Sequence, residues 1–525
     1  MVQGETGTEG KGVPPDVPEY TDNENRNDGS THANGSKTAP DKSKVKRQLY
    51  DRSASTQIKP SGLYYDVPDN PPIHLATMFG FQIAMTNIFS CVNMAVIVSK
   101  FICSDQEFAA SLYSTTSVMS GICTILQTSL GVRLPVFQGP SILFTLPYMN
   151  AATEPAWGCQ SEITDFNSSL LTNGTISQSR EQPWLTQWNK IQGSLMAASG
   201  LQIVIGAFGL GGLLLRAMGP ISITCLILLL GLSIQSLISV VAEIHWGMSC
   251  LNIVIIIIIS QYVNRYNVPM PTWSRRGGFK FVPFPLFELF PVLLSVIIGW
   301  VISYIFTVCG LFPDDSSVLQ YQARTDFAID SVRNAPVFTV PYPGQYGAPS
   351  IKLSYFVMIA VVVLASILES VGDYVQTTGP SRVAVPPPHA INRGIIMEGL
   401  GSFLSGAMGA GHATTSYSNT IGMIGITKVA SRRVFNIAGL IMILMGVCGK
   451  LGAVFVAIPK PVLVGPIFIA ISLLVGAALS NLKAVDLWSS RSQGVLGIAI
   501  MAGTVFPTWL QQHPGTFKTG VQLVN

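Results

Sequence analysis

The chain has 525 residues, of which 48% are hydrophobic and 11% are charged, with a net charge of +4. A soluble globular protein usually carries about 25% charged residues, so this composition excludes a water-soluble body of this length. The basic residues lie in short clusters between apolar runs, which argues against a nucleic-acid-binding surface. The sequence contains no nucleophile–base pair, metal-ligand set or phosphate-binding glycine loop, so it predicts neither an enzyme nor a cofactor.

Residues 1–70 are rich in Asn, Asp, Gly, Pro, Ser and Thr and poor in aliphatic side chains. Such a segment cannot bury enough apolar surface to offset the entropy cost of ordering, which predicts a disordered N-terminal tail. No signal peptide precedes the first apolar run, so that run is expected to act as the targeting signal.

The rest of the chain alternates apolar runs with polar loops. A helix needs roughly 20 apolar residues to cross a hydrocarbon layer of about 30 Å. Thirteen runs predict an all-α polytopic membrane protein, with a transmembrane domain over residues 71–509 and a C-terminal tail over 510–525. The runs are, approximately, 74–99, 107–131, 135–152, 192–215, 218–240, 248–263, 286–311, 351–373, 394–411, 412–427, 434–457, 461–481 and 493–509.

Two features of the loops predict the same orientation. The hydrophilic loop 153–191 follows the third run and contains glycosylation sequons at Asn167 and Asn173, so an extracellular loop implies a cytoplasmic N-terminus. The positive-inside rule agrees, because basic residues gather after even-numbered runs. They are Arg133, Arg216, Arg265, Arg275, Arg276, Lys280, Arg382, Arg393, Lys428, Arg432 and Arg433.

Three carboxylates lie inside apolar runs, where burying a charge is costly and indicates a function. Glu369 and Asp373 are four residues apart, so a helix presents them on one face. We expect them to line a polar cavity, one bonding to substrate and the other helping to hold a cation; the alternative is that the helix ends here and both acids are interfacial. For Glu398, the sequence is compatible with two roles: a structural pairing with a neighbouring helix and a contact with the substrate path.

Two of the apolar runs are short and interrupted by polar residues. The segment GHATTSYSNTIG at 411–422 has seven hydroxyl or amide side chains in twelve positions, and the third run contains Gln138, Gly139, Pro140 and Ser141. Irregular backbone at membrane depth survives only inside protein or beside water, although 411–422 could instead be an extracellular loop. Runs three and ten are seven apart, and interruptions at corresponding positions of two halves indicate an inverted-repeat binding site.

Several blocks of the sequence resemble the nucleobase–ascorbate transporters of solute carrier family 23, in particular the animal sodium-coupled vitamin C transporter branch. The resemblance extends from about residue 70 to the end. The blocks are LQTSLGVRLPVFQ (126–138), ESVGDY (369–374), PPPHAINRGIIMEGLGSFLSGAMG (386–409), NTIGMIGITKVASRRV (419–434) and SNLKAVDLWSSRS (480–492).

The resemblance implies a fourteen-span fold of two inverted seven-helix repeats. A core domain (spans 1–4 and 8–11) would carry the site and move in an elevator-like manner against a gate domain (spans 5–7 and 12–13 here) that mediates dimerisation. By motif position, Glu369 is the substrate-binding acid, and Asp373 and Glu398 are the ion-coupling acids, Asp373 being the candidate sodium ligand. The further substrate-binding residues implied are Gln138, Ser141, Ser418, Asn419 and Thr420.

The sequence departs from the family pattern in three places. The span-ten signature reads Asn419-Thr420, where the family has Pro-Asn, Gln-Asn or Glu-Asn. The first span usually carries Gln-His, whereas Gln82 is followed by Ile83. After the thirteenth run the chain reads LQQHPGTFKTGVQLVN, without a fourteenth span, so the gate domain is expected to be truncated.

The leading hypothesis is a homodimeric plasma-membrane symporter that couples sodium to uptake of ascorbate or a nucleobase. A proton-coupled permease for uracil, xanthine or urate is the near alternative. A second class is a non-transporting relative that binds or regulates a partner, which the altered signature and missing span favour. Against it, Glu369, Asp373 and Glu398 have little physical reason to persist in apolar surroundings without a cavity.

Overall fold

The computed structural model describes residues 62–145, 147–148, 183–217, 219–274, 278–315, 318–480, 482 and 485–513. Most of the tail predicted to be disordered lies outside these ranges. The sequons at Asn167 and Asn173 and most of the segment 510–525 also lie outside the described residues.

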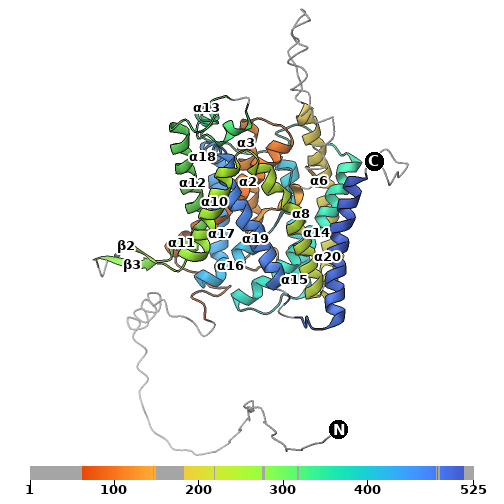
Figure 1. The fold of residues 1–525 in the computed structure, drawn as a ribbon. Helices are drawn as coiled ribbons and strands as arrows, with labels where there is room; N and C mark the ends of the chain where they lie inside the picture. The colour runs from red at the N-terminus through yellow and green to blue at the C-terminus, as the bar shows by residue number, and fades with distance from the viewer. Residues whose placement is uncertain are drawn as a thin grey trace, which may run out of the picture. The chain divides into compact units, whose positions relative to one another are not determined.

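Within the described residues, each predicted apolar run coincides with a helix or with a short strand and a helical segment (Figure 1). Within the described ranges, five helical segments are long and apolar enough to cross a membrane, or six if a pair bent by 91° (Gly449–Val456 and Lys460–Ile469) counts as one span. The five are α2 (Ile73–Phe101), α3 (Gln106–Ser129), α10 with the π-helix η3 (Trp246–Val263), α12 (Pro291–Val308) and α14 (Leu353–Ser381).

One group of helices packs around α3 and α15, and we call it the α3–α15 bundle. Small residues let its helices approach closely: a Cβ on Gly121 of α3 would lie 2.3 Å from the carbonyl oxygen of Gly439 on α17. Besides α2, α3 and α14, the bundle contains α6 (Pro183–Ala207), α7 (Leu210–Ala217), α15 (Pro388–Met408), α17 (Arg432–Val447) and α18 (Gly449–Val456).

A second group packs around α10 and α19, and we call it the α10–α19 bundle. Its outer surface is apolar: Val301 of α12 is 53% exposed and Ile498 of α20 is 73% exposed, as expected of side chains that face lipid. Besides α10 and α12, the bundle contains α8 (Pro220–Ile234), α9 (Ser236–Ala242), α11 (Leu286–Leu289), η5 (Lys460–Leu463), α19 (Val464–Ser480) and α20 (Ser490–Gln512).

Runs three and ten each form a short strand followed by a helix. β1 (Gln138–Pro140) precedes η1 (Ile142–Phe144), and β4 (Thr414–Ser416) precedes α16 (Ser418–Thr427). The two strands pair antiparallel. This arrangement confirms the predicted interruptions, and the burial of residues 411–416 excludes an extracellular loop there.

The connection from α12 to α14 is fastened to both bundles. In its first part, Arg324 pairs with Asp314 and Asp326, and the Ser303 hydroxyl of α12 donates to the Ala323 carbonyl in η4 (Leu319–Ala323). In its later part, the Thr339 N–H donates to the Val447 carbonyl of α17 at 2.8 Å. Between the two parts lies the short helix α13 (Ile329–Asn334).

Two features had no counterpart in the sequence interpretation. The loop between η3 and α11 contains an antiparallel hairpin of β2 (Val268–Ser274) and β3 (Gly278–Phe284), which projects from the helices in Figure 1. Cys103, just after α2, is disulfide-bonded.

Candidate functional site

The centre of the candidate site is the crossing of β1 and β4, where two chain segments far apart in sequence meet. Gln138 is paired with Ser416, Gly139 with Thr415, and Pro140 with Thr414. All six residues are buried, and the backbone pairing extends to Ser141 and Tyr417 on either side. The N-terminus of α16 and the start of η1 follow the strands directly, so both helical segments begin at the crossing.

The sequence explains why this close crossing forms. A Cβ on Gly139 would lie 1.6 Å from Cε2 of the Tyr417 ring, so only glycine permits the ring to lie against β1. The Tyr417 hydroxyl donates to the carbonyl of Pro140 at 2.6 Å. Pro140 itself has no N–H to donate and is confined to extended or turn backbone, which favours a short strand over a helix at this depth.

Helix α3 fixes both strands from one side. The Gln138 N–H donates to the Thr124 hydroxyl at 2.9 Å. The Thr116 hydroxyl is 2.9 Å from Nε2 of His412, which precedes β4 and is fully buried. His412 therefore holds β4 against α3, and this structural role accounts for a buried histidine in the site.

Glu398 of α15 is the hub of a buried hydrogen-bond network. Its Oε1 accepts from Gln138 Nε2 at 3.1 Å, from the Ser416 hydroxyl at 2.9 Å and from the Tyr374 hydroxyl at 2.7 Å. The Tyr374 hydroxyl in turn accepts from Gln127 of α3. The acid thus ties together β1, β4, α14 and α3. Of the two roles left open by the sequence, this geometry directly supports the structural one.

Glu369 and Asp373 lie on α14, which continues to Ser381 and so runs eight residues beyond Asp373. The alternative that the helix ends at these acids is therefore wrong. Asp373 and Glu398 are each 1% exposed. Between the two acids of α14, the Ser370 hydroxyl is 2.8 Å from the Thr415 hydroxyl of β4. The three carboxylates predicted from the sequence thus gather at the crossing.

Several buried polar atoms at the crossing have no hydrogen-bond partner among the described residues. They are the hydroxyl of Ser141, Oε1 of Gln138, Oε2 of Glu369 and Oε2 of Glu398. Leaving such groups unpaired costs about 1–3 kcal/mol each. A cluster of acceptors with one hydroxyl is suited to a small polar solute or a cation that supplies the missing partners.

The remaining sequence candidates lie at the start of α16. Ser418 and Asn419 are its first two residues, and their side chains lie outside what the structure describes. Thr420 is fully buried, and its hydroxyl donates to the Tyr417 carbonyl at 2.8 Å. That bond uses the hydroxyl hydrogen in a contact with the residue before the helix and leaves the oxygen as an acceptor.

The sequence interpretation did not identify Tyr374, Ser416 and Gln127 as members of this site. Tyr374 directly follows Asp373 in the ESVGDY block, but its hydroxyl reaches Glu398 only because α14 and α15 pack together. Ser416 is one of several hydroxyl residues in the tenth run, and the sequence pattern does not distinguish it from the others. Gln127 carried no signal, because a single amide in an apolar helix is compatible with many roles.

A cavity of about 270 Å³ lies between the two bundles beside α16. Ser90 and Asn93 of α2 line it on one side, and Glu288 of α11 and Gln261 of η3 line it on the other. Glu369 is not among its lining residues. Met423 and Gly422 of α16 also line it, and α16 begins directly after β4, so this helix connects the cavity with the crossing.

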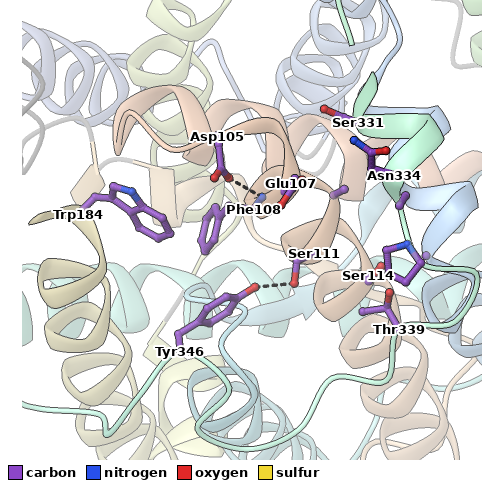
Figure 2. A pocket seen from close by; sticks show the side chains of 14 residues that line it. Asp105, Glu107, Phe108, Ser111, Ser114, Trp184, Ser331, Asn334, Thr339 and Tyr346 are labelled. Carbon is purple, nitrogen blue, oxygen red and sulfur yellow. Dashed lines mark hydrogen bonds between the residues drawn. The ribbon is translucent and has the colours of Figure 1, made fainter. Parts of the chain in front are cut away.

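A second cavity, of about 420 Å³, lies at the N-terminal end of α3, and Figure 2 shows its side chains. Asp105 caps α3 by accepting from the Phe108 N–H at 2.8 Å, and the Tyr346 hydroxyl is 2.7 Å from that of Ser111. Burial of the Tyr346 ring raises its pKa to about 12, so its hydroxyl stays protonated at neutral pH. This cavity lies away from the crossing, at the end of α3 opposite to Arg133.

A protein-family model and several known proteins match most of this chain. The family model Xan_ur_permease, described as a permease family, matches residues 75–512. Solute carrier family 23 member 2 of Mus musculus is 37% identical over 484 residues, which is 91% of this chain and 74% of that protein. Nucleobase-ascorbate transporter 2 of Arabidopsis thaliana is 27% identical over 454 residues, covering 86% of this chain and 80% of that protein.

Among solved structures, the transmembrane domain of a cyanobacterium bicarbonate transporter, BicA, aligns with 83% of this chain and 98% of its own. The sequence identity is 14% and the TM-score is 0.47.

Proposed function

Because the chain belongs to the xanthine/uracil permease family and is an integral membrane protein, we propose that it is a secondary active transporter for ascorbate or a nucleobase, coupled to sodium. The observation that carries the proposal is the cluster of unpaired buried polar atoms at the crossing of β1 and β4. The plant relative is named a nucleobase-ascorbate transporter, which supports the solute class.

In this proposal, substrate binds where β1 and β4 cross. Glu369 accepts hydrogen bonds from the donors of a planar ring, and the Ser141 hydroxyl bonds to an adjacent ring atom. The backbone N–H groups at the start of α16, which include those of Ser418 and Asn419, are directed at the same space, and the helix dipole favours an anionic or electron-rich solute there. Thr420 contributes by fixing this helix start rather than by donating to the solute.

Sodium would bind beside the substrate, with Asp373 as its principal ligand. Sodium is held in transporters by oxygen atoms of carboxylates, amides and unwound backbone. Oε2 of Glu398 and Oε1 of Gln138 are such oxygens, and both lack a hydrogen-bond partner among the described residues. A cation there would also offset the mutual repulsion of Glu369, Asp373 and Glu398.

We propose that the α3–α15 bundle is the moving core and the α10–α19 bundle is the gate. The cavity of about 270 Å³ between them supports a path from the crossing to one side of the membrane. The α12–α14 connection is fastened to the gate by Ser303 and to the core by Thr339, so α13 between these points would bend as the core moves. We also propose that the chain forms a homodimer through the gate and that its N-terminus is cytoplasmic.

A proton-coupled nucleobase permease is the second candidate. It is favoured by Oε2 of Glu369, which accepts no hydrogen bond from the described residues and could carry a proton instead. Ile83 stands where the family usually has a titratable histidine, so a proton-coupled mechanism in this chain would rely on Glu369.

The test is uptake of labelled ascorbate, uracil and xanthine into proteoliposomes containing the purified chain, under an imposed sodium gradient or an imposed proton gradient. Sodium-driven accumulation of one solute supports the first proposal, and proton-driven accumulation supports the second. E369Q should abolish accumulation, whereas E107Q, which changes an exposed acid near the N-terminus of α3, should not. Wild-type protein that accumulates none of these solutes under either gradient would contradict both proposals.

A further inference from the structure

A third cavity, of about 360 Å³, lies where the C-terminal end of α3 meets the N-terminal end of α17. It lies at the opposite end of α3 from the cavity in Figure 2, which Asp105 and Glu107 line. Its walls come from the segment before α2, from α3 and from the first turns of α17. The polar residues of its walls are Asp69, Asn70, Thr128, Ser129, Arg432, Arg433 and Asn436.

The N-terminus of α17 opens onto this cavity without a side-chain cap. Ser431 occupies the cap position, but its hydroxyl donates to the Asp69 carbonyl at 2.6 Å and accepts nothing from the first turn of the helix. The Arg432 N–H donates to the Val67 carbonyl at 3.3 Å. The partial positive charge of a 16-residue helix is therefore directed toward the cavity.

Two guanidinium groups line the same space without a carboxylate partner. Within the described residues, neither Arg432 nor Arg433 forms an ion pair, and Nε of Arg432 is buried with no hydrogen-bond partner. By contrast, Lys100 pairs with Glu243 at 2.8 Å. A buried guanidinium donor without an acceptor is costly, which indicates that a ligand supplies one.

The only acid among the wall residues named above is already engaged. Oδ2 of Asp69 accepts from the Asp66 N–H at 2.6 Å, within the turn that precedes α2. Two guanidinium groups against one carboxylate leave an excess of positive charge in the cavity. Ser129 and Asn436 add neutral polar groups, and Nδ2 of Asn436 donates to the Ser129 hydroxyl at 3.4 Å.

We propose that this cavity binds a phosphate group, held by Arg432, Arg433 and the N-terminus of α17. A guanidinium matches the geometry of phosphate oxygens, and helix N-termini bind the same anion. The phosphate comes either from the headgroup of an anionic lipid or from a soluble phosphate. The ends of membrane helices are the depth at which headgroups lie, and basic pockets between such helices bind them.

Occupancy of the cavity would affect the crossing through α3. The cavity joins α3 to α17, and the Thr128 hydroxyl donates to Oδ1 of Asn436 across this joint. One turn earlier on α3, the Thr124 hydroxyl accepts from the Gln138 N–H of β1. A ligand that draws α17 and α3 together therefore steadies the helix that supports β1.

The experiment measures thermal stability of the purified full chain in detergent against two probes. One probe is inorganic phosphate, compared with chloride at equal ionic strength. The other is short-chain phosphatidylinositol 4-phosphate, compared with short-chain phosphatidylcholine. Wild-type protein should be stabilised in a saturable manner by a phosphate-bearing probe. R432Q/R433Q should raise the concentration for half-maximal effect by about tenfold or more, since charge-assisted hydrogen bonds are lost.

Two further variants separate binding from folding. N70D places a negative charge in the wall at an exposed position and should weaken binding while both arginines remain. R382Q removes an exposed arginine at the end of α14 and should leave the response unchanged.

If the lipid stabilises the protein at concentrations where inorganic phosphate does not, the site binds a lipid headgroup. If the lipid and inorganic phosphate stabilise the protein at equal concentrations, the site binds soluble phosphate. Equal responses of the wild type, R432Q/R433Q and N70D, or a wild type that responds to neither probe, would overturn the proposal.

Discussion

The hydroxyl of Tyr374 links Glu398 to Gln127, and its removal is a direct test of the buried network. Y374F keeps the ring and deletes one oxygen. The lost bond to Glu398, 2.7 Å long in the structure, is a bond to a carboxylate and contributes about 1.5–3 kcal/mol. The change also leaves Nε2 of Gln127 without its acceptor, which costs about 1–3 kcal/mol before relaxation.

Because buried side chains relax and the two costs are not additive, we expect a net loss of about 3 kcal/mol in the free energy of unfolding. In a protein of this size that corresponds to a fall in Tm of roughly 3 °C, because the unfolding entropy is about 2.1 cal/mol/K per residue. The assay is thermal unfolding of purified protein in detergent, followed by tryptophan fluorescence.

Y355F is the matched control for this experiment. Tyr355 lies on the same helix and is 1% exposed, but its hydroxyl donates to Oε1 of Gln187 at 3.4 Å, near the limit of a hydrogen bond. This variant should lose less than about 1 kcal/mol. Equal falls in Tm for Y374F and Y355F, or no fall for Y374F, would refute the account of Glu398 as a hub.

Two further predictions concern the crossing and the α12–α14 connection. G139A should abolish uptake and lower Tm, because the added Cβ would lie 1.6 Å from the Tyr417 ring. The control is G200A on α6, where no atom lies within 4 Å of the added Cβ, and it should change neither uptake nor Tm. Uptake by G139A at the wild-type rate would contradict the close crossing of β1 and β4. The Arg324 guanidinium lowers the pKa of Asp326 below its ordinary value of 3.8, so the stability from this pair is full above about pH 4 and is lost as pH falls through the lowered pKa. The Asp326 side chain is 43% exposed, so R324Q should lower the free energy of unfolding by under about 1 kcal/mol at pH 7. The difference in Tm between R324Q and the wild type should vanish on acidification. A Tm difference that does not change with pH would contradict the stabilising effect assigned to this pair.

The helical framework could be predicted from the sequence because hydropathy alone specifies it. In the part of the chain that the structure describes, the apolar runs form helices, and the Gly139-Pro140 and GHATTSYSNTIG interruptions contain β1 and β4. The polar surroundings of Glu369 and Asp373 could also be predicted, since burying carboxylates in a membrane demands polar neighbours, whereas the role of Glu398 stayed open.

The contacts within the site could not be predicted, because they depend on how helices distant in sequence pack. The bond from Tyr374 to Glu398 needs α14 against α15, and the position of Tyr417 over Gly139 needs the strands in register. The β2–β3 hairpin was missed because its strands contain proline and lie in a loop rich in basic residues. The disulfide at Cys103 was missed because its spacing carries no signal.

The measurement that tests the central claim most directly is equilibrium binding of labelled ascorbate, uracil and xanthine to purified protein, in sodium and in choline. The account predicts that the wild type binds one of these solutes more tightly in sodium, and that E369Q and S141A bind it at least tenfold more weakly while their Tm stays near that of the wild type. Unchanged binding by both E369Q and S141A would contradict the assignment of the crossing as the substrate site.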